Sequence, residues 1–424
     1  TGSVEPERRL ELEDALRTNE LKALVATSAL GMGFDKGDLS FCVHLGLPPT
    51  PVAYYQQVGR AGRALDHAEV IAVPRPVEDA AIWSWFESVS LPSEEICRSV
   101  IDLLDHDEPT SAVALEPNVN LGRSRLGILL SILEVDGAIT RSGNGFVRTD
   151  QDWTYDHELV DALRELRRRE ADEMLTWARY PACRLRFLRE ALDDTTATDC
   201  GRCDRCTGRG WQRDPDPLAV AAAHDVLRRG DLVIDLRRQW PSGLGEPRGR
   251  IAADLQASPG RALARLGDAG WAPVVERLIA DSEAAEPIAV PDELLAAIAA
   301  TLKRWDWSQR PTWICPVPSQ RRATLVEAVA DSLGSLGGLP VHRALVGDVS
   351  GGFQTDQANS AHQVTNVWHR FRVEPSVVPD GRLPSGPVLL VDDEVQSRWT
   401  VTVAAWRLRE AGAGAVLPFA LRAR

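Results

Sequence analysis

The chain has 424 residues and a formal net charge of −13. This length fits about three or four domains of roughly 100–200 residues each, and the acidic balance excludes a uniformly basic coat for nucleic acid. No apolar run approaches the roughly 20 residues needed to span a bilayer, and no signal peptide opens the sequence. We therefore expect a soluble, cytoplasmic protein in which any DNA contact comes from local patches.

The first part of the chain alternates helix and strand patterns. Residues 5–20 predict a helix and residues 21–27 a buried strand that leads into a glycine-rich turn. Residues 41–45 and 70–73 predict two further strands, each followed by proline. Strands that alternate with helices indicate a parallel α/β sheet, and we expect this domain to cover residues 1–88.

Between the last two strands stands the sequence YYQQVGRAGR, at residues 54–63. It holds Arg60 and Arg63, each preceded by a glycine. Glycine lets the backbone approach an anion closely, and the planar fork of arginine matches phosphate. Together with the strand and turn at residues 24–36, this stretch resembles motifs V and VI of superfamily 2 helicases, and the RecQ branch in particular.

The resemblance implies a second RecA-like lobe, which closes on ATP and Mg²⁺ held by a first lobe. Arg60 and Arg63 would then be arginine fingers that stabilise charge at the γ-phosphate.

The resemblance also assigns roles to four residues around these arginines. Gln56 would position the arginines, and Gly33 with Asp35 would line the nucleotide cleft. Thr27 would contact a DNA phosphate.

The first ATPase lobe is expected to be missing from this chain. A Walker A loop needs the pattern G-x-x-x-x-G-K-[ST], and none of the three lysines, Lys22, Lys36 and Lys303, stands in one. No Asp-Glu-x-His sequence follows a strand either. The chain is either a fragment or comes from a parent that has lost its motor, and we favour the fragment.

Residues 89–150 predict short helices followed by a β-hairpin around Asn144 and Gly145. Helices followed by a hairpin suggest a winged-helix-like domain. A small packing domain with solvated arginines explains the pattern as well. The candidate DNA-facing residues are Arg123, Arg125, Arg141 and Arg148.

Residues 151–213 predict a helix from about 157 to 192, followed by a cluster of cysteines in the pattern C-x16-C-x2-C-x2-C. These are Cys183, Cys200, Cys203 and Cys206. Four thiolates at such spacing favour one structural Zn²⁺ over disulfides in a reducing cytosol. The spacing is similar to that of the RecQ zinc-binding subdomain. Arg202 and Arg205 lie among the cysteines as candidate phosphate contacts, although they also fit a solvated surface.

Residues 214–282 predict a connector domain with Trp240 and Trp271 mostly in its core. Stacking of a base on Trp240 is the alternative.

Residues 283–424 predict a second α/β domain. A strand at 313–318 leads to Arg321 and Arg322, and a strand at 388–391 leads to Asp392 and Asp393. Acidic residues before a hydroxyl-rich helix N-terminus suit ribose hydroxyls and a phosphate.

Residues 311–422 resemble the ComF-like type I phosphoribosyltransferases. By that resemblance the two aspartates would take the ribose hydroxyls, and the two arginines the pyrophosphate of phosphoribosyl pyrophosphate. Ser397 and Thr400 would take the 5-phosphate. Arg398 replaces a glycine of that loop and Trp399 a small residue, which puts turnover in doubt.

The whole pattern predicts the C-terminal portion of an ATP-dependent, 3′-to-5′ DNA helicase of the RecQ type with an appended phosphoribosyltransferase-like domain. It is similar to the RecQ-like helicases of actinobacteria, so a bacterial cytosol is expected. Two alternatives remain open. One is a nucleotide-metabolism enzyme with a vestigial helicase half, and the other is a non-catalytic zinc and winged-helix DNA-binding module.

Overall fold

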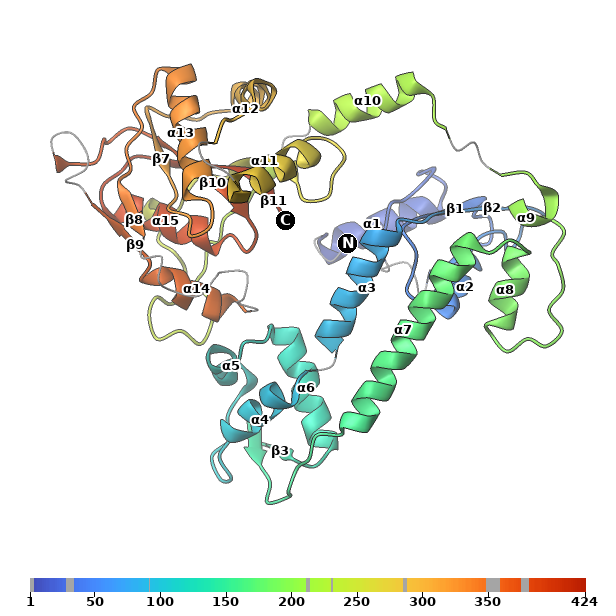
Figure 1. Ribbon diagram of the computed structural model, residues 1–424. Helices are drawn as coiled ribbons and strands as arrows, with labels where there is room; N and C mark the ends of the chain where they lie inside the picture. Colours follow the sequence, from blue (N-terminus) through green and yellow to red (C-terminus); the bar gives the residue numbers. More distant parts are fainter. Residues whose placement is uncertain are drawn as a thin grey trace. The chain divides into compact units, whose positions relative to one another are not determined.

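The computed structural model describes residues 4–27, 34–90, 92–210, 214–229, 232–284, 288–347, 359–374 and 381–424. The chain divides into two compact units (Figure 1). The first unit contains residues 1–94 and 154–213, and the second contains residues 95–153 and 214–424.

A two-stranded parallel sheet lies in the first unit. β1 (Phe41–Leu45) pairs with β2 (Glu69–Val73), and Val43 lies opposite Ile71. These two strands confirm the predicted strands at 41–45 and 70–73. The helices of this segment are α1 (Pro6–Arg17), α2 (Pro51–Val58) and α3 (Pro76–Ser90).

The predicted buried strand at residues 21–27 was wrong. These residues form no regular element in the structure, and Val25 is 94% exposed. An apolar run becomes a buried strand only where neighbouring strands pair with it, because its backbone groups need partners. Among the described residues, no strand pairs with this segment.

The core of the first unit forms between α2, α3 and two of three later helices. The three later helices are α7 (His157–Arg179), α8 (Arg184–Glu190) and α9 (Asp204–Thr207), of which α7 and α8 contribute to the core. The predicted helix from about 157 to 192 is broken at Tyr180, whose ψ of 131° is extended. Pro181 follows, and proline disfavours helical geometry in the preceding residue. The buried core consists of Leu47, Tyr54, Trp83, Met174, Trp177 and Leu188.

The second unit begins with a small helical segment that ends in a hairpin. β3 (Ile139–Ser142) and β4 (Gly145–Arg148) form the predicted antiparallel hairpin. Thr110 forms an isolated antiparallel bridge with Phe146, so a third segment pairs with this hairpin. The helices are α4 (Glu94–Asp102), α5 (Ala112–Leu115), the 3-10 helix η2 (Glu116–Asn118) and α6 (Arg123–Val135).

The rest of the second unit is a five-stranded sheet in the order β5-β6-β11-β10-β7. Neighbours from β6 to β7 are parallel, and β5 is antiparallel at one edge. The strands are β5 (Leu232–Ile234), β6 (Gly260–Arg265), β7 (Trp313–Pro316), β10 (Val388–Val395) and β11 (Val416–Ala423).

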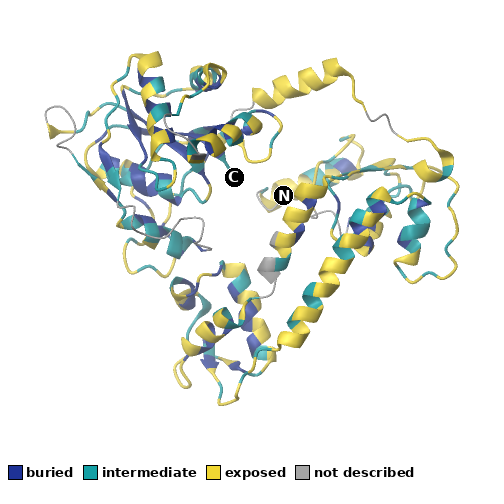
Figure 2. Ribbon diagram, viewed as in Figure 1, coloured by how far each residue is buried: buried dark blue, intermediate teal, exposed yellow. Residues whose placement is uncertain are grey.

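Helices cover both faces of this sheet, and each face has its own core. Val388 and Leu390 of β10 pack in one core and Leu389 and Val391 in the other, as alternation along a strand requires. The strands are accordingly buried (Figure 2). One core includes α14 (Ser360–Trp368) and α15 (Trp399–Glu410), and the other includes α11 (Ala272–Ala284), α12 (Asp292–Arg304) and α13 (Ala323–Gly337).

The segment predicted to be a separate connector, residues 214–282, contributes β5 and β6 to this sheet. Its Trp240 is buried in a core with Trp399, so it is not a free stacking platform. Before the sheet, α10 (Pro217–Arg228) has no buried residue. The remaining elements are η3 (Ala253–Leu255) and the hairpin of β8 (Leu345–Gly347) and β9 (Phe371–Val373). None of the described helices has the length and apolar character to cross a membrane.

Candidate functional site

The turn that follows α2 is held in a defined conformation. The Thr50 side chain caps α2 by accepting from the Ala53 N–H at 3.0 Å. After Val58 the chain turns, and the N–H of Gly62 donates to the carbonyl of Leu39 at 2.9 Å. Gly62 has a φ of 73°, which favours glycine at this position. The local fold thus fixes the turn against residues 37–39.

This turn brings together two of the predicted residues. The Arg63 guanidinium lies 2.9 Å from the Asp35 carboxylate, and its Nε–H also donates to the carbonyl of Gly59. Arg60 donates instead to the carbonyl of Phe34. Both arginines therefore lie against the segment that begins at residue 34. Arg63 is exposed, whereas Arg60 is half-buried.

The other residues predicted for this site are less closely placed. Gln56 is exposed, whereas its neighbour Gln57 lies 2.8 Å from His44 Nε2. Thr27 is also exposed. Gly33 lies outside the described residues.

The four predicted cysteines converge in the first unit. Their sulfur atoms all lie within 4.8 Å of one another, and this group is the metal-binding candidate within the described ranges. Cys183 precedes α8, and its sulfur accepts from the N–H groups of Arg186 and Cys200 at 3.4 and 3.2 Å. Such N–H···S contacts favour thiolates. The donor set and its spacing fit a tetrahedral Zn²⁺.

The charges around these sulfurs point to the same chemistry. Burial alone would raise the pKa of the Cys183 thiol, but the backbone N–H groups that it accepts from lower it to about 7. The pKa of Cys206 is raised to about 12, because burial and the adjacent Cys203 thiol disfavour a further negative charge. In a closed structural site, all four cysteines would bind the metal as thiolates. Arg184 and Asp204 form a bidentate ion pair that links α8 to α9 beside the cluster.

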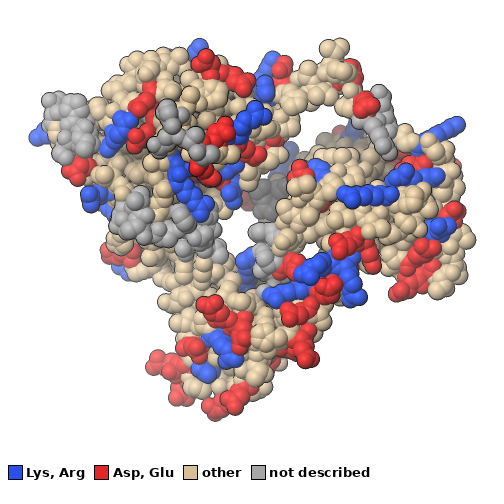
Figure 3. Space-filling model, in the orientation of Figure 1, with Lys and Arg blue, Asp and Glu red and all other residues tan. Residues whose placement is uncertain are grey.

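The arginines predicted to face DNA lie mostly in pairs with carboxylates. Arg123 contacts Glu116, Arg141 lies 3.1 Å from Glu134, and Arg148 lies 3.2 Å from Asp102. Figure 3 shows basic and acidic side chains interspersed over the α4–β4 segment.

Burial lowers the pKa of Arg125. Near the cysteines, Arg202 is exposed and Arg205 lies 3.7 Å from Asp204. Arg205, like Arg123, Arg141 and Arg148, thus lies beside a carboxylate.

The carboxyl ends of β7 and β10 lie side by side in the second unit, since Val391 is in register with Pro316. On its other side, β7 forms a parallel bridge with Val341. The segment that follows β7 in the chain therefore lies on one side of this strand, and β10 lies on the other side. In open α/β sheets, ligands bind in the crevice at such a switch point.

Asp392, Asp393 and Arg322 meet at this edge. Arg322 Nη1 lies 2.7 Å from Asp393 and also contacts Glu283 at 3.0 Å through Nε. Burial and the adjacent Asp393 charge raise the pKa of Asp392 well above its usual range. Arg321 is exposed. In this arrangement the Arg322 guanidinium pairs with the Asp393 carboxylate.

The loop from Ser397 to Thr400 has the left-handed backbone conformation at Arg398 that a glycine would adopt. Arg398 has a φ of 71°, the left-handed conformation in which glycine is usual. The Trp399 ring is buried and stacks on Trp240 at 5.8 Å between ring centroids, so it fills the core rather than the loop. Ser397 Oγ accepts from the Trp399 N–H at 3.5 Å.

Several partners in this region were not predicted from the sequence. Glu394 accepts from Arg422 of β11 at 2.6 Å and also contacts Arg424, which follows the strand. Arg237 follows β5 and lies over the Trp399 ring at 5.4 Å. Glu394 follows the predicted aspartates directly, but its partners are set by the pairing of β10 with β11, for which the residues gave no signal.

Comparison with known proteins finds similarity to helicases. Residues 1–65 match the family model described as the helicase conserved C-terminal domain. The ATP-dependent helicase SGS1 of Saccharomyces cerevisiae is 45% identical over 62 residues, which are 15% of this chain and 4% of that protein. The ATP-dependent DNA helicase RecQ of Pasteurella multocida is 32% identical over 103 residues, or 24% of this chain and 16% of that protein.

The RecQ helicase of Bacillus subtilis is 42% identical over 62 residues, which cover 15% of this chain and 10% of the relative. A crystal structure of the DUF1998 helicase MrfA bound to DNA matches 36% of this chain and 22% of that chain with 23% identity and a TM-score of 0.18. The chain thus spans only a small part of the length of its curated relatives. Residues 1–65 are thus similar to the C-terminal domain of helicases, and the chain as a whole is similar to RecQ helicases over a short stretch.

Proposed function

We propose that the chain is the C-terminal portion of an ATP-dependent DNA helicase of the RecQ type, which unwinds duplexes in the 3′-to-5′ direction. The observation that carries the proposal is the turn after α2, where Arg63 contacts Asp35 beside Arg60. The match of residues 1–65 to the helicase family model and the similarity to RecQ helicases support it.

In this function Arg60 and Arg63 contact the γ-phosphate of ATP held by a first lobe. Asp35 orients Arg63 through their ion pair and keeps its guanidinium extended before ATP arrives. Because a pre-positioned charge costs no reorganisation in the transition state, such arginines raise the rate of phosphoryl transfer by about 10³–10⁵-fold.

The direct test is DNA-stimulated ATP hydrolysis. This chain holds no Walker A lysine, so the pure protein is expected to hydrolyse no ATP with or without DNA. In a longer protein that joins these residues to a first lobe, Arg63→Ala should lower turnover by about 10³-fold or more while DNA binding persists.

Arg8→Ala is the matched control, since Arg8 forms an exposed pair within α1. Hydrolysis by this chain alone, or near-normal turnover by Arg63→Ala, would contradict the assignment.

The zinc module and the helical segment would supply DNA contacts. In this proposal Cys183, Cys200, Cys203 and Cys206 hold one structural Zn²⁺, and the cation balances their thiolates. Arg202 and Arg205 lie on the same module, where their charges reach phosphates once it is folded. Thr27 would contact a further phosphate.

A second function is favoured by the switch point at the ends of β7 and β10. We infer that the C-terminal domain binds a phosphoribosyl compound with Mg²⁺, with Asp392 and Asp393 at the ribose hydroxyls and Arg322 at a phosphate. Binding would require Arg322 to leave Asp393, which it contacts at 2.7 Å. We therefore expect weak binding and little transferase turnover.

Titration calorimetry of the whole chain with phosphoribosyl pyrophosphate and Mg²⁺ tests this inference. The heat of binding should be lost in Asp392→Asn and kept in Asp331→Asn, which changes an exposed acidic residue of α13. An absence of heat in the wild type would make the domain a structural appendage. Rapid turnover with a free base would show that the Arg398 loop does not impede the reaction.

A further inference from the structure

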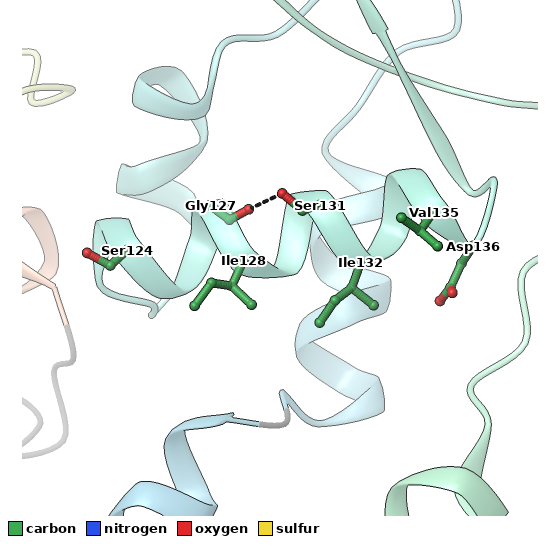
Figure 4. A pocket seen from close by; sticks show the side chains of 7 residues that line it. All are labelled: Ser124, Gly127, Ile128, Ser131, Ile132, Val135 and Asp136. Carbon is green, nitrogen blue, oxygen red and sulfur yellow. Dashed lines mark hydrogen bonds between the residues drawn. The ribbon is translucent and has the colours of Figure 1, made fainter. Parts of the chain in front are cut away.

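The outward face of α6 carries apolar side chains that the described parts of the chain leave exposed. Ile128 is 57% exposed, Ile132 39% and Val135 87%. They follow one another at spacings of four and three residues, so they lie on one side of the helix. Figure 4 shows Ile128 and Ile132 pointing to the same side of α6. The opposite side carries the buried leucines of the core, Leu126, Leu129, Leu130 and Leu133.

Small residues complete this face. Ser124, Gly127 and Ser131 lie beside the branched side chains and, together with Asp136, line a hollow of about 520 Å³. A Cβ built on Gly127 would meet nothing within 4 Å. The Ser131 hydroxyl donates to the Gly127 carbonyl at 3.0 Å, so it is satisfied within the helix. A second helix could therefore approach to the about 8–10 Å between axes that close packing gives.

The charges at the two ends of α6 have opposite sign. Arg123 and Arg125 lie in its first turn, and Glu134 and Asp136 lie at its end. Arg123 and Glu134 already contact Glu116 and Arg141. A basic end and an acidic end match each other when two copies of the helix run antiparallel.

We propose that this face binds the same face of a second copy of the chain in an antiparallel, two-fold symmetric pair. A two-fold interface uses one patch on both partners, so the patch has to complement itself. In the proposed pair, each branched residue lies opposite a small residue of the other copy, at the same height along the helix axes. Arg125 of each copy lies near Asp136 of the other. The opposed residues are Ile128 and Ser131, Ile132 and Gly127, and Val135 and Ser124.

The size of the face sets the strength of the pair. One side of a helix of 13 residues buries less than the about 800 Å² per partner of a standard interface. The dimer is therefore weak and forms as the protein concentration rises. A DNA-reading role fits this face less well, because its centre holds no cation and phosphate contacts need them.

Sedimentation velocity over a series of concentrations tests the proposal. The wild type should move from monomer to dimer in the micromolar range, and Ile128→Glu should stay monomeric. Leu336→Glu is the matched control, since Leu336 is 61% exposed on α13, outside the face, and this variant should dimerise like the wild type. Circular dichroism establishes that each variant is folded.

A charge exchange separates the specific pair from general apolar adhesion. Arg125→Glu alone should weaken dimerisation several-fold, and adding Asp136→Arg in the same chain should restore it. A wild type that stays monomeric, or an Ile128→Glu variant that still dimerises, would overturn the proposal. The proposal would also be overturned if Ile128→Glu lost DNA binding but had the same monomer–dimer equilibrium as the wild type, because the face would then bind nucleic acid.

Discussion

The ion pair between Arg322 and Asp393 makes a quantitative prediction about the stability of the C-terminal sheet. The two side chains are 13% and 9% exposed, and their charged atoms lie 2.7 Å apart. Arg322→Met removes the positive charge and leaves Asp393 beside Asp392 at the buried edge of the sheet. Removing one partner of a buried pair costs about 3–5 kcal/mol. Because Arg322 is not fully buried, we expect a loss near the lower end, about 3 kcal/mol.

Urea unfolding followed by tryptophan fluorescence measures this loss, since the cores of the sheet contain Trp313 and Trp399. In a double-mutant cycle, Asp393→Asn in the Arg322→Met background should recover most of the stability, because no buried charge then lacks a partner. If Arg322→Met costs less than about 1 kcal/mol, the pair behaves like an exposed one, and the reasoning from burial fails. A coupling near zero in the cycle would refute it as well.

Three further predictions concern separate parts of the molecule. Asp392 has a raised pKa in the folded state, so the stability that its protonated form contributes is complete below its unfolded pKa of about 3.9 and is lost as pH rises through the folded pKa. Asp392→Asn should therefore be more stable than the wild type at alkaline pH in urea titrations. Equal pH profiles of the two proteins would contradict this. The wild type should hold one zinc ion per chain, and Cys203→Ser should lower this content and unfold the zinc module. Elemental analysis measures the zinc content and proteolysis the unfolding, and Cys42→Ser should change neither. Asn359→Ala should cost about 1–3 kcal/mol, because the buried amide donates to the carbonyls of Glu116 and Val119 at 3.0 and 2.6 Å; an unchanged urea midpoint would argue against it.

What the sequence could predict depended on how local the determining interactions are. Three of the four cysteines lie within seven residues, from Cys200 to Cys206, so their spacing indicated their convergence. The hairpin at residues 139–148 was predicted because its turn signal is local. The break in the predicted helix before Pro181 is also set locally, because proline disfavours helical geometry in the residue before it, but the prediction did not take this proline into account.

The features that escaped prediction depend on distant pairing. An apolar run such as residues 21–27 carries no information about whether neighbouring strands exist, and here the described residues supply none. The contact of Arg322 with Asp393 follows from the register of β7 with β10, which lie far apart in sequence. Likewise β5 and β6 join the C-terminal sheet through β11, so residues 214–282 looked independent when read alone.

The left-handed backbone at Arg398 has a consequence for how this domain can change over generations. A non-glycine residue in that conformation costs about 1–2 kcal/mol, yet the loop around it holds the shape that glycine would adopt. Arginine codons that begin with cytosine become glycine codons through a single base change. A lineage could therefore exchange arginine for glycine at this position in one mutational step. The loop keeps that route open in both directions.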